Sequence, residues 1–204
     1  MVKEAKIVAI TGPSGVGKNT LGEMLKKNFG FAVPTHCTTR TKREDDEDGF
    51  YSYLSHEEYA KLLTEGKFLF SSGDGPEVKK EYGNFYGVLK DDINEALKES
   101  ENIILYVSYK DLQALHQLKI AGAKIDIIAL KFKDIKKGVL NRISLNSSRN
   151  HSESDIQKRV QSALDLDAKY SKILENLATS IIYTDELNIS QMFRKACLDL
   201  NLTV

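Results

Sequence analysis

Apolar residues gather in short, nearly continuous runs that are separated by longer stretches of helical periodicity. The runs cover Ile7–Thr11, Ile103–Val107, Ile125–Phe132 and Ser180–Thr184. Unbroken runs of Ile, Leu and Val are typical of strands that are buried on both faces of a parallel sheet. The expected helices cover Lys18–Asn28, Ser55–Gly66, Asp91–Glu99, Asp111–Lys119, Asp134–Leu145, Glu153–Leu177 and Ser190–Leu200. Their alternation with the strands predicts a doubly wound α/β fold, with ligands at the carboxyl ends of the strands.

Two segments break this alternation. Residues 33–88 are polar, aromatic and rich in turns, with short strand-like pieces at Phe50–Leu54, Lys67–Ser71 and Phe85–Leu89. Residues 146–152 form a small polar loop between two predicted helices. Segments of this kind can provide a seat for a substrate and a mobile cover that excludes water from a reaction.

A glycine-rich segment lies between the first strand and the first helix. Residues 12–20 read GPSGVGKNT, which fits the phosphate-binding P-loop pattern. Glycines let successive N–H groups face one anion, the helix start adds a positive dipole end, and Lys18 brings a mobile charge. The pattern requires Ser or Thr after the lysine, whereas this chain has Asn19 and then Thr20. The expected phosphate contacts are Gly12, Ser14, Gly15, Val16, Gly17, Lys18, Asn19 and Thr20.

A second set of candidate phosphate ligands lies in residues 38–43, which read TTRTKR. Arg40 and Arg43 can bind one phosphate together, because a planar guanidinium offers paired donors. Hydroxyl groups that can add neutral donors belong to Thr39, Tyr51 and Tyr86. A mixed basic and acidic run is also typical of a solvated loop. We therefore interpret Asp45–Asp48 as solvated, or as a support for Arg43.

Three further arginines surround the polar loop of residues 146–152. Arg142 lies on the helix before the loop, Arg149 in the loop and Arg159 on the helix after it. Arginines on exposed helices are more often surface residues, so each alone is a weak indication. Closure of the loop would bring all three onto the transferring phosphates, where phosphoryl transfer requires positive charge around the equatorial oxygens.

Composition limits the class of protein. The 204 residues carry a net charge of zero, which does not favour a nucleic-acid or membrane surface. The two cysteines form no disulfide framework and indicate a reducing compartment. No apolar run approaches the ~20 residues of a membrane span, and the N-terminus lacks a signal peptide, so we expect a cytoplasmic protein.

Taken together, these segments resemble the guanylate kinase family of nucleoside monophosphate kinases over nearly the whole chain. The resemblance rests on the P-loop, on the TTRxxR motif of residues 38–43 with Tyr51, on Phe85-Tyr86-Gly87 and on the three arginines. The segment Thr184-Asp185-Glu186 corresponds to the region near the donor base.

The resemblance implies a three-layer P-loop kinase with a parallel core sheet, an inserted acceptor-binding subdomain and a short lid in one domain. The core would comprise residues 1–32, 89–140 and 160–204, the insert residues 33–88 and the lid residues 141–159. The family transfers the γ-phosphoryl group of ATP, which is bound with Mg²⁺, to GMP. The expected partners are small-molecule nucleotides, without nucleic acid or membrane, and the expected state is a monomer or a homodimer.

The resemblance also implies roles for individual residues. The transferring phosphoryl group would be served by Lys18, Arg142, Arg149 and Arg159. The acceptor phosphate would be held by Thr39, Arg40, Arg43, Tyr51 and Tyr86. The positions that face the acceptor base in the family correspond here to His36, Phe70, Val88 and Ser108.

The departures from the family pattern cluster on the acceptor base. The family reads guanine with carboxylates at the positions of Phe70 and Ser108, and with hydroxyl residues at those of Val88 and His36. A carboxylate from the inserted residues 73–81 could replace the missing acceptor; Asp74, Glu77 and Glu81 are the candidates. Alternatively, the substrate is another nucleoside monophosphate or a sugar phosphate. Asn19 leaves the magnesium ligand open, with Thr20, phosphates and water as alternatives.

A second class of function is compatible with the same resemblance. Guanylate-kinase-like domains also serve in scaffold proteins as peptide-binding modules without catalysis. Lys18 and the three arginines favour the enzyme, whereas the altered base pocket favours the binding module.

Overall fold

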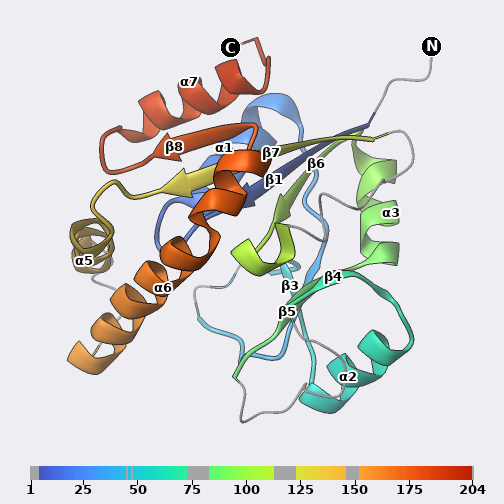
Figure 1. Ribbon diagram of the computed structural model, residues 1–204. Coiled ribbons are helices and arrows are strands. Elements are labelled where there is room, and N and C mark those ends of the chain that lie inside the picture. Colours follow the sequence, from blue (N-terminus) through green and yellow to red (C-terminus); the bar gives the residue numbers. More distant parts are fainter. Residues whose placement is uncertain are drawn as a thin grey trace.

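The computed structural model describes residues 5–44, 46, 48–72, 83–112, 123–145 and 152–203. Its core is a sheet of four parallel strands in the spatial order β6-β1-β7-β8 (Figure 1). The strands are β1 (Ala5–Thr11), β6 (Asn102–Tyr106), β7 (Ala123–Lys131) and β8 (Ser180–Tyr183). Each lies within two residues of a predicted apolar run, which confirms the parallel core. Because the strands are parallel, their carboxyl ends share one edge of the sheet.

Alternate residues of β1 pack into different layers of the core. Val8 and Ile10 face the cluster that includes α1 (Lys18–Phe29) and α7 (Ile189–Asp199). Their neighbours on the other face contact α3 and α6, of which the bounds are Lys90–Glu99 and Glu153–Leu177. Helices therefore cover both faces of the sheet, and the three-layer arrangement is confirmed. α5 (Ile135–Leu145) precedes α6 along the chain.

A second, smaller sheet lies beside the core in the order β3-β2-β5-β4 (Figure 1). Its strands are β2 (His36–Thr38), β3 (Tyr51–Tyr53), β4 (Phe68–Ser71) and β5 (Tyr86–Leu89). β2 pairs in parallel with β3 and antiparallel with β5, which also pairs antiparallel with β4. The sheet and α2 (His56–Thr64) bury their own small cluster of Cys37, Tyr59, Phe68 and Phe85.

Two details of the predicted elements have clear outcomes. The capping box before α2 is confirmed, since Ser55 Oγ accepts from the Glu58 amide at 3.1 Å and the Ser55 amide donates to Glu58 Oε2 at 2.7 Å. Of the helix predicted over Asp111–Lys119, the structure describes only residues 111 and 112; Asp111 ends a 3₁₀ turn that begins at Tyr109, and residues 113–122 lie outside the described part. The inserted residues 73–81 also lie outside it. No helix among the described residues is both long and apolar enough to cross a bilayer.

Candidate active site

The turn between β1 and α1 has the backbone geometry of an anion cradle. Gly12 has a φ of 149° and Gly17 a φ of 106°, values that favour glycine. A Cβ atom on Gly12 would overlap the carbonyl oxygen of Leu130 and lie 2.8 Å from Cγ1 of Val16, which is fully buried. Gly17 is the N-cap of α1 and provides no side-chain cap, so the first N–H groups of α1 are presented toward the turn.

Lys18 folds back over this turn. Its Nζ donates to the carbonyl oxygens of Gly12 at 2.8 Å and Pro13 at 3.0 Å. Burial lowers the pKa of Lys18 to about 8. Among the described residues, the hydrogen-bond partners of this ammonium are carbonyl oxygens, and its removal from water strengthens its attraction to a phosphate.

Two of the three predicted arginines meet the turn. Arg159 of α6 donates from Nη1 to Ser14 Oγ at 3.1 Å. Arg142 lies on α5, the helix that precedes the polar loop. Its Cβ is 3.5 Å from the position that a Cβ on Gly15 would occupy. Arg149 lies outside the described residues. Arg159 thus brings its guanidinium to the glycine turn from a distant part of the chain, and α5 places the Cβ of Arg142 beside the same turn.

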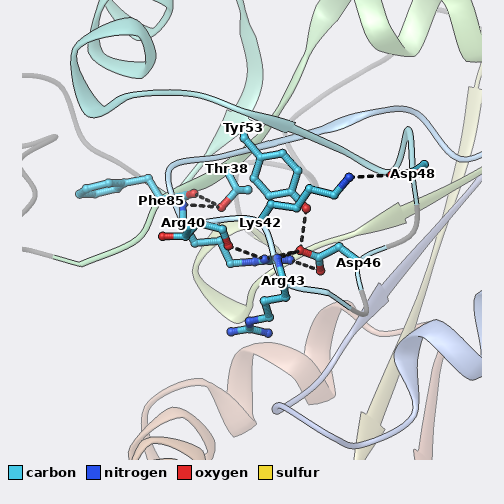
Figure 2. Close-up of polar contacts among 9 residues, drawn as sticks. Thr38, Arg40, Lys42, Arg43, Asp46, Asp48, Tyr53 and Phe85 are labelled. Carbon is cyan, nitrogen blue, oxygen red and sulfur yellow. Dashed lines mark hydrogen bonds and ion pairs between the residues drawn. The ribbon is translucent and has the colours of Figure 1, made fainter. Parts of the chain in front are cut away.

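On the acceptor side, Arg40 and Asp46 form a paired contact (Figure 2). Nη1 and Nη2 of Arg40 each donate to one carboxylate oxygen at 2.6 Å. The side chains are 6% and 8% exposed, so this pair is almost completely removed from solvent. The hydrogen bonds from Arg40, the Tyr53 hydroxyl and the Arg43 amide hold the pKa of Asp46 well below its ordinary value, although burial opposes them. The interpretation of Asp46 as a solvated residue is wrong; it supports both arginines of the motif.

The other candidates for the acceptor phosphate lie around this pair. The Arg40 guanidinium carbon is 4.6 Å from the centroid of the Tyr51 ring. Arg43 is exposed, and Figure 2 shows its side chain pointing away from the Arg40–Asp46 pair. Thr39 Oγ1 accepts from the Phe85 amide at 2.9 Å, and Tyr86 is 38% exposed.

The residues expected beside the acceptor base are engaged within the protein. His36 donates from Nδ1 to the Pro34 carbonyl at 2.8 Å and accepts the Tyr106 amide on Nε2 at 3.3 Å. Burial lowers its pKa to about 4, so the ring is neutral near pH 7. Its ring also stacks on Phe50 with centroids 5.2 Å apart. This side of the site is therefore a packed aromatic wall.

The three remaining base-side positions are also engaged within the protein. Phe70 is 6% exposed and belongs to the main core with Val88. Ser108 donates from Oγ to Asp111 Oδ2 at 2.6 Å and caps the turn that follows β6. None of these contacts requires a ligand.

Reasoning from the sequence missed the roles of Tyr53 and Tyr106. Tyr53 donates to Asp46 Oδ2 at 2.6 Å. Tyr106 packs against His36 and Phe50, with ring centroids 5.7 and 5.4 Å away. No motif marks either tyrosine, because their partners lie in other segments of the fold.

The sequence comparisons agree on one family, and a solved structure shares the fold. Residues 4–188 match the family model described as guanylate kinase. A guanylate kinase of Clostridioides difficile is 27% identical over 166 residues, which are 80% of this chain and 75% of that protein. One of Fusobacterium nucleatum is 28% identical over 174 residues, 83% of this chain and 87% of that protein. The crystal structure of guanylate kinase from Anaplasma phagocytophilum has the same fold, with a TM-score of 0.66, 16% identity and coverage of 97% of this chain and 85% of that one.

Proposed function

The chain belongs to the guanylate kinase family, and on that premise we propose that it transfers the γ-phosphoryl group of ATP to GMP, giving ADP and GDP. The observation that carries this proposal is that the charged groups of Lys18 and Arg159 contact one glycine turn, beside which α5 places Arg142. Phosphoryl transfer depends mainly on positioning and on positive charge around the transferring group. A binding module has no need for three cations from separate elements at such a turn.

In the proposed reaction, an oxygen of the acceptor phosphate forms a bond to the γ-phosphorus while the bond to the β–γ bridging oxygen breaks. ADP leaves with that oxygen. Lys18 exchanges its carbonyl partners for phosphate oxygens, and the turn supplies backbone N–H donors. Arg142 and Arg159 neutralise the charge that spreads over the equatorial oxygens, and Arg149 joins them from the lid.

On the acceptor side, Thr39, Arg43, Tyr51 and Tyr86 contact the phosphate, and Asp46 holds Arg40 beside it. His36, Phe70 and Ser108 form the wall against which the base packs. We retain the division into a core (residues 1–32, 89–140 and 160–204), an insert (33–88) and a lid (141–159).

Mg²⁺ accompanies ATP in this chemistry and neutralises phosphate charge when it is bound. The described residues contain no group of three His, Cys, Asp or Glu side chains that could hold a metal ion. The turn does offer two exposed neutral oxygen donors, the Asn19 amide and the Thr20 hydroxyl. These residues fit an ion that takes most of its ligands from phosphates and water.

A second acceptor class is favoured by one observation. Phe70 and Val88 present only apolar surface where a purine edge would be read, and both are buried. A site without a hydrogen-bonding partner for guanine discriminates weakly between bases, whereas a matched site can discriminate by roughly 10⁴–10⁵.

The decisive experiment measures ADP formation from Mg·ATP with GMP, dGMP, AMP, UMP, CMP, dTMP and ribose bisphosphate. The proposal expects turnover with GMP that Lys18→Ala reduces by orders of magnitude in a folded protein. Turnover with a different acceptor would support the second class. Absence of turnover with every acceptor would support the binding module.

A further inference from the structure

The Asp46 carboxylate joins three parts of the acceptor side. It accepts two hydrogen bonds from the Arg40 guanidinium at 2.6 Å, one from the Tyr53 hydroxyl at 2.6 Å and one from the Arg43 backbone amide at 2.7 Å (Figure 2). Arg40 Nη1 also donates to the Thr41 carbonyl at 3.0 Å. The loop between Arg40 and Asp46 is thereby closed on itself by a single side chain.

This arrangement gives the two arginines different electrostatic states. Arg40 is buried and its charge is compensated by the carboxylate at contact distance. Arg43 is exposed, and only its backbone amide is bound to Asp46. Because a compensated guanidinium attracts a dianion less than an uncompensated one, and no carboxylate among the described residues pairs with the Arg43 guanidinium, an arriving phosphate is attracted more strongly to Arg43 than to Arg40.

We propose that Asp46 is a positioning residue for the acceptor phosphate, which fixes the Arg40–Asp46 loop so that Arg43 points into the acceptor site. This inference rests on the proposed function. It predicts that phosphate binding becomes weaker when the negative charge of Asp46 beside the phosphate site is removed. A carboxylate that only repelled the phosphate would have the opposite effect.

The neighbouring Asp48 provides a matched control. Its carboxylate also forms a 2.6 Å ion pair, with Lys42, but these side chains are 92% and 55% exposed. Exposed pairs contribute little, because water screens them and side-chain entropy opposes them. Asp48→Asn therefore makes the same change of charge in the same loop without disturbing the Arg40 contact.

The test compares Asp46→Asn, Asp48→Asn and wild type in the full chain, with KM for GMP, KM for ATP, kcat and thermal unfolding. We expect Asp46→Asn to raise KM for GMP roughly 10- to 100-fold, as for other residues that orient a binding group. KM for ATP should change less than about threefold, and Asp48→Asn should leave both constants within that range. An unchanged or lowered KM for GMP in a folded Asp46→Asn protein overturns the proposal.

Two further measurements keep the test decisive. If Asp46→Asn fails to fold, Tyr53→Phe removes one hydrogen bond and retains the ion pair; we expect KM for GMP to rise roughly two- to tenfold, and no rise overturns the proposal. Binding of inorganic phosphate is read as a thermal shift; the part of the shift that Arg43→Ala removes belongs to the acceptor side, and Asp46→Asn should reduce that part. Because that reading needs no turnover, a wild type inactive on GMP counts against the proposed function alone.

Discussion

The hydroxyl of Tyr106, at the end of β6, occupies the space that a side chain on Gly22 of α1 would need. A Cβ atom on Gly22 would overlap Tyr106 Oη and lie 2.8 Å from Cζ. From Tyr106 the aromatic contacts continue to Phe50 and then to Tyr51, with centroids 5.4 and 4.6 Å apart. Tyr51 in turn lies under the Arg40 guanidinium. One row of rings therefore connects the helix of the phosphate-binding turn to the acceptor side.

Gly22→Ala should destabilise the protein, although alanine is the better helix former by about 1 kcal/mol. The methyl group must displace the Tyr106 ring, and overpacking of this kind costs about 1–3 kcal/mol. The measurement is the free energy of unfolding in denaturant. Lys27→Ala, at an exposed position of the same helix, serves as the control. A Gly22→Ala protein that is more stable than wild type would show that the helix propensity of alanine outweighs the overlap with Tyr106.

Phe70→Glu tests whether a carboxylate can simply be restored at the base side. Phe70 is buried within the main core, so an ionised side chain there lacks both water and a partner. We expect a loss of more than about 3 kcal/mol of stability, comparable to deletion of a buried Phe, with no improvement in KM for GMP.

The measurements are thermal unfolding and the KM for GMP of Phe70→Leu, Lys67→Glu and Phe70→Glu. Together they separate the effect of side-chain size from the effect of side-chain charge. Phe70→Leu keeps an apolar side chain, and Lys67→Glu places the carboxylate at an exposed position just before β4. A stable Phe70→Glu protein with a lower KM for GMP would contradict the interpretation that packed side chains close the base side of the site.

The core and the phosphate turn could be predicted because their evidence is local. Each core strand is a continuous apolar run, and the turn is a contiguous motif whose glycines and lysine act within nine residues. The helix starting at Ser55 was predictable for the same reason, since both members of its capping box lie in one turn.

Three strands of the second sheet, β3, β4 and β5, lie within the predicted strand-like pieces, but β2 and the acceptor-side pair could not be predicted in this way. β2 reads His-Cys-Thr, which lacks an apolar run, and it is a strand because β3 and β5 supply its partners. Asp46 lies in an acidic run that is typical of solvated loops, and its burial results from the rings of Tyr51 and Tyr53 beside Arg40. The pairing of β2 with β5 joins distant parts of the chain, and the Arg40–Asp46 contact depends on how one loop folds, so neither leaves a spacing signature.

Arg159→Ala should reduce kcat by roughly 10³- to 10⁵-fold, the range for an arginine that neutralises a transferring phosphoryl group. Arg159 reaches the turn through its hydrogen bond to Ser14. Steady-state kcat with Mg·ATP and GMP checks this outcome. Arg194→Ala, which removes the same side chain from an exposed position of α7, should leave kcat within about twofold. An equal loss of kcat in both variants would contradict a specific role of Arg159.

The depressed pKa of Lys18 predicts that activity and stability respond oppositely to alkaline pH. The ammonium, with an ordinary value of 10.5 and a value of about 8 here, loses its charge in the folded protein well before it does so in the unfolded chain. As kcat/KM for ATP reports the free enzyme, it should fall as pH rises through about 8. Between about 8 and 10.5 the unfolded chain binds more protons, so this residue's contribution makes the fold more stable as pH rises.

Measurements of kcat/KM for ATP from about pH 6.5 to 9.5, with thermal unfolding in the same buffers, separate the two effects. Lys18→Arg is the control, since a guanidinium stays charged above pH 12 and its residual kcat/KM should not fall near 8. A wild-type profile that stays flat to pH 9.5 would mean that kcat/KM for ATP does not depend on the charge of Lys18. A parallel loss of activity and thermal stability would instead assign the alkaline limb to unfolding.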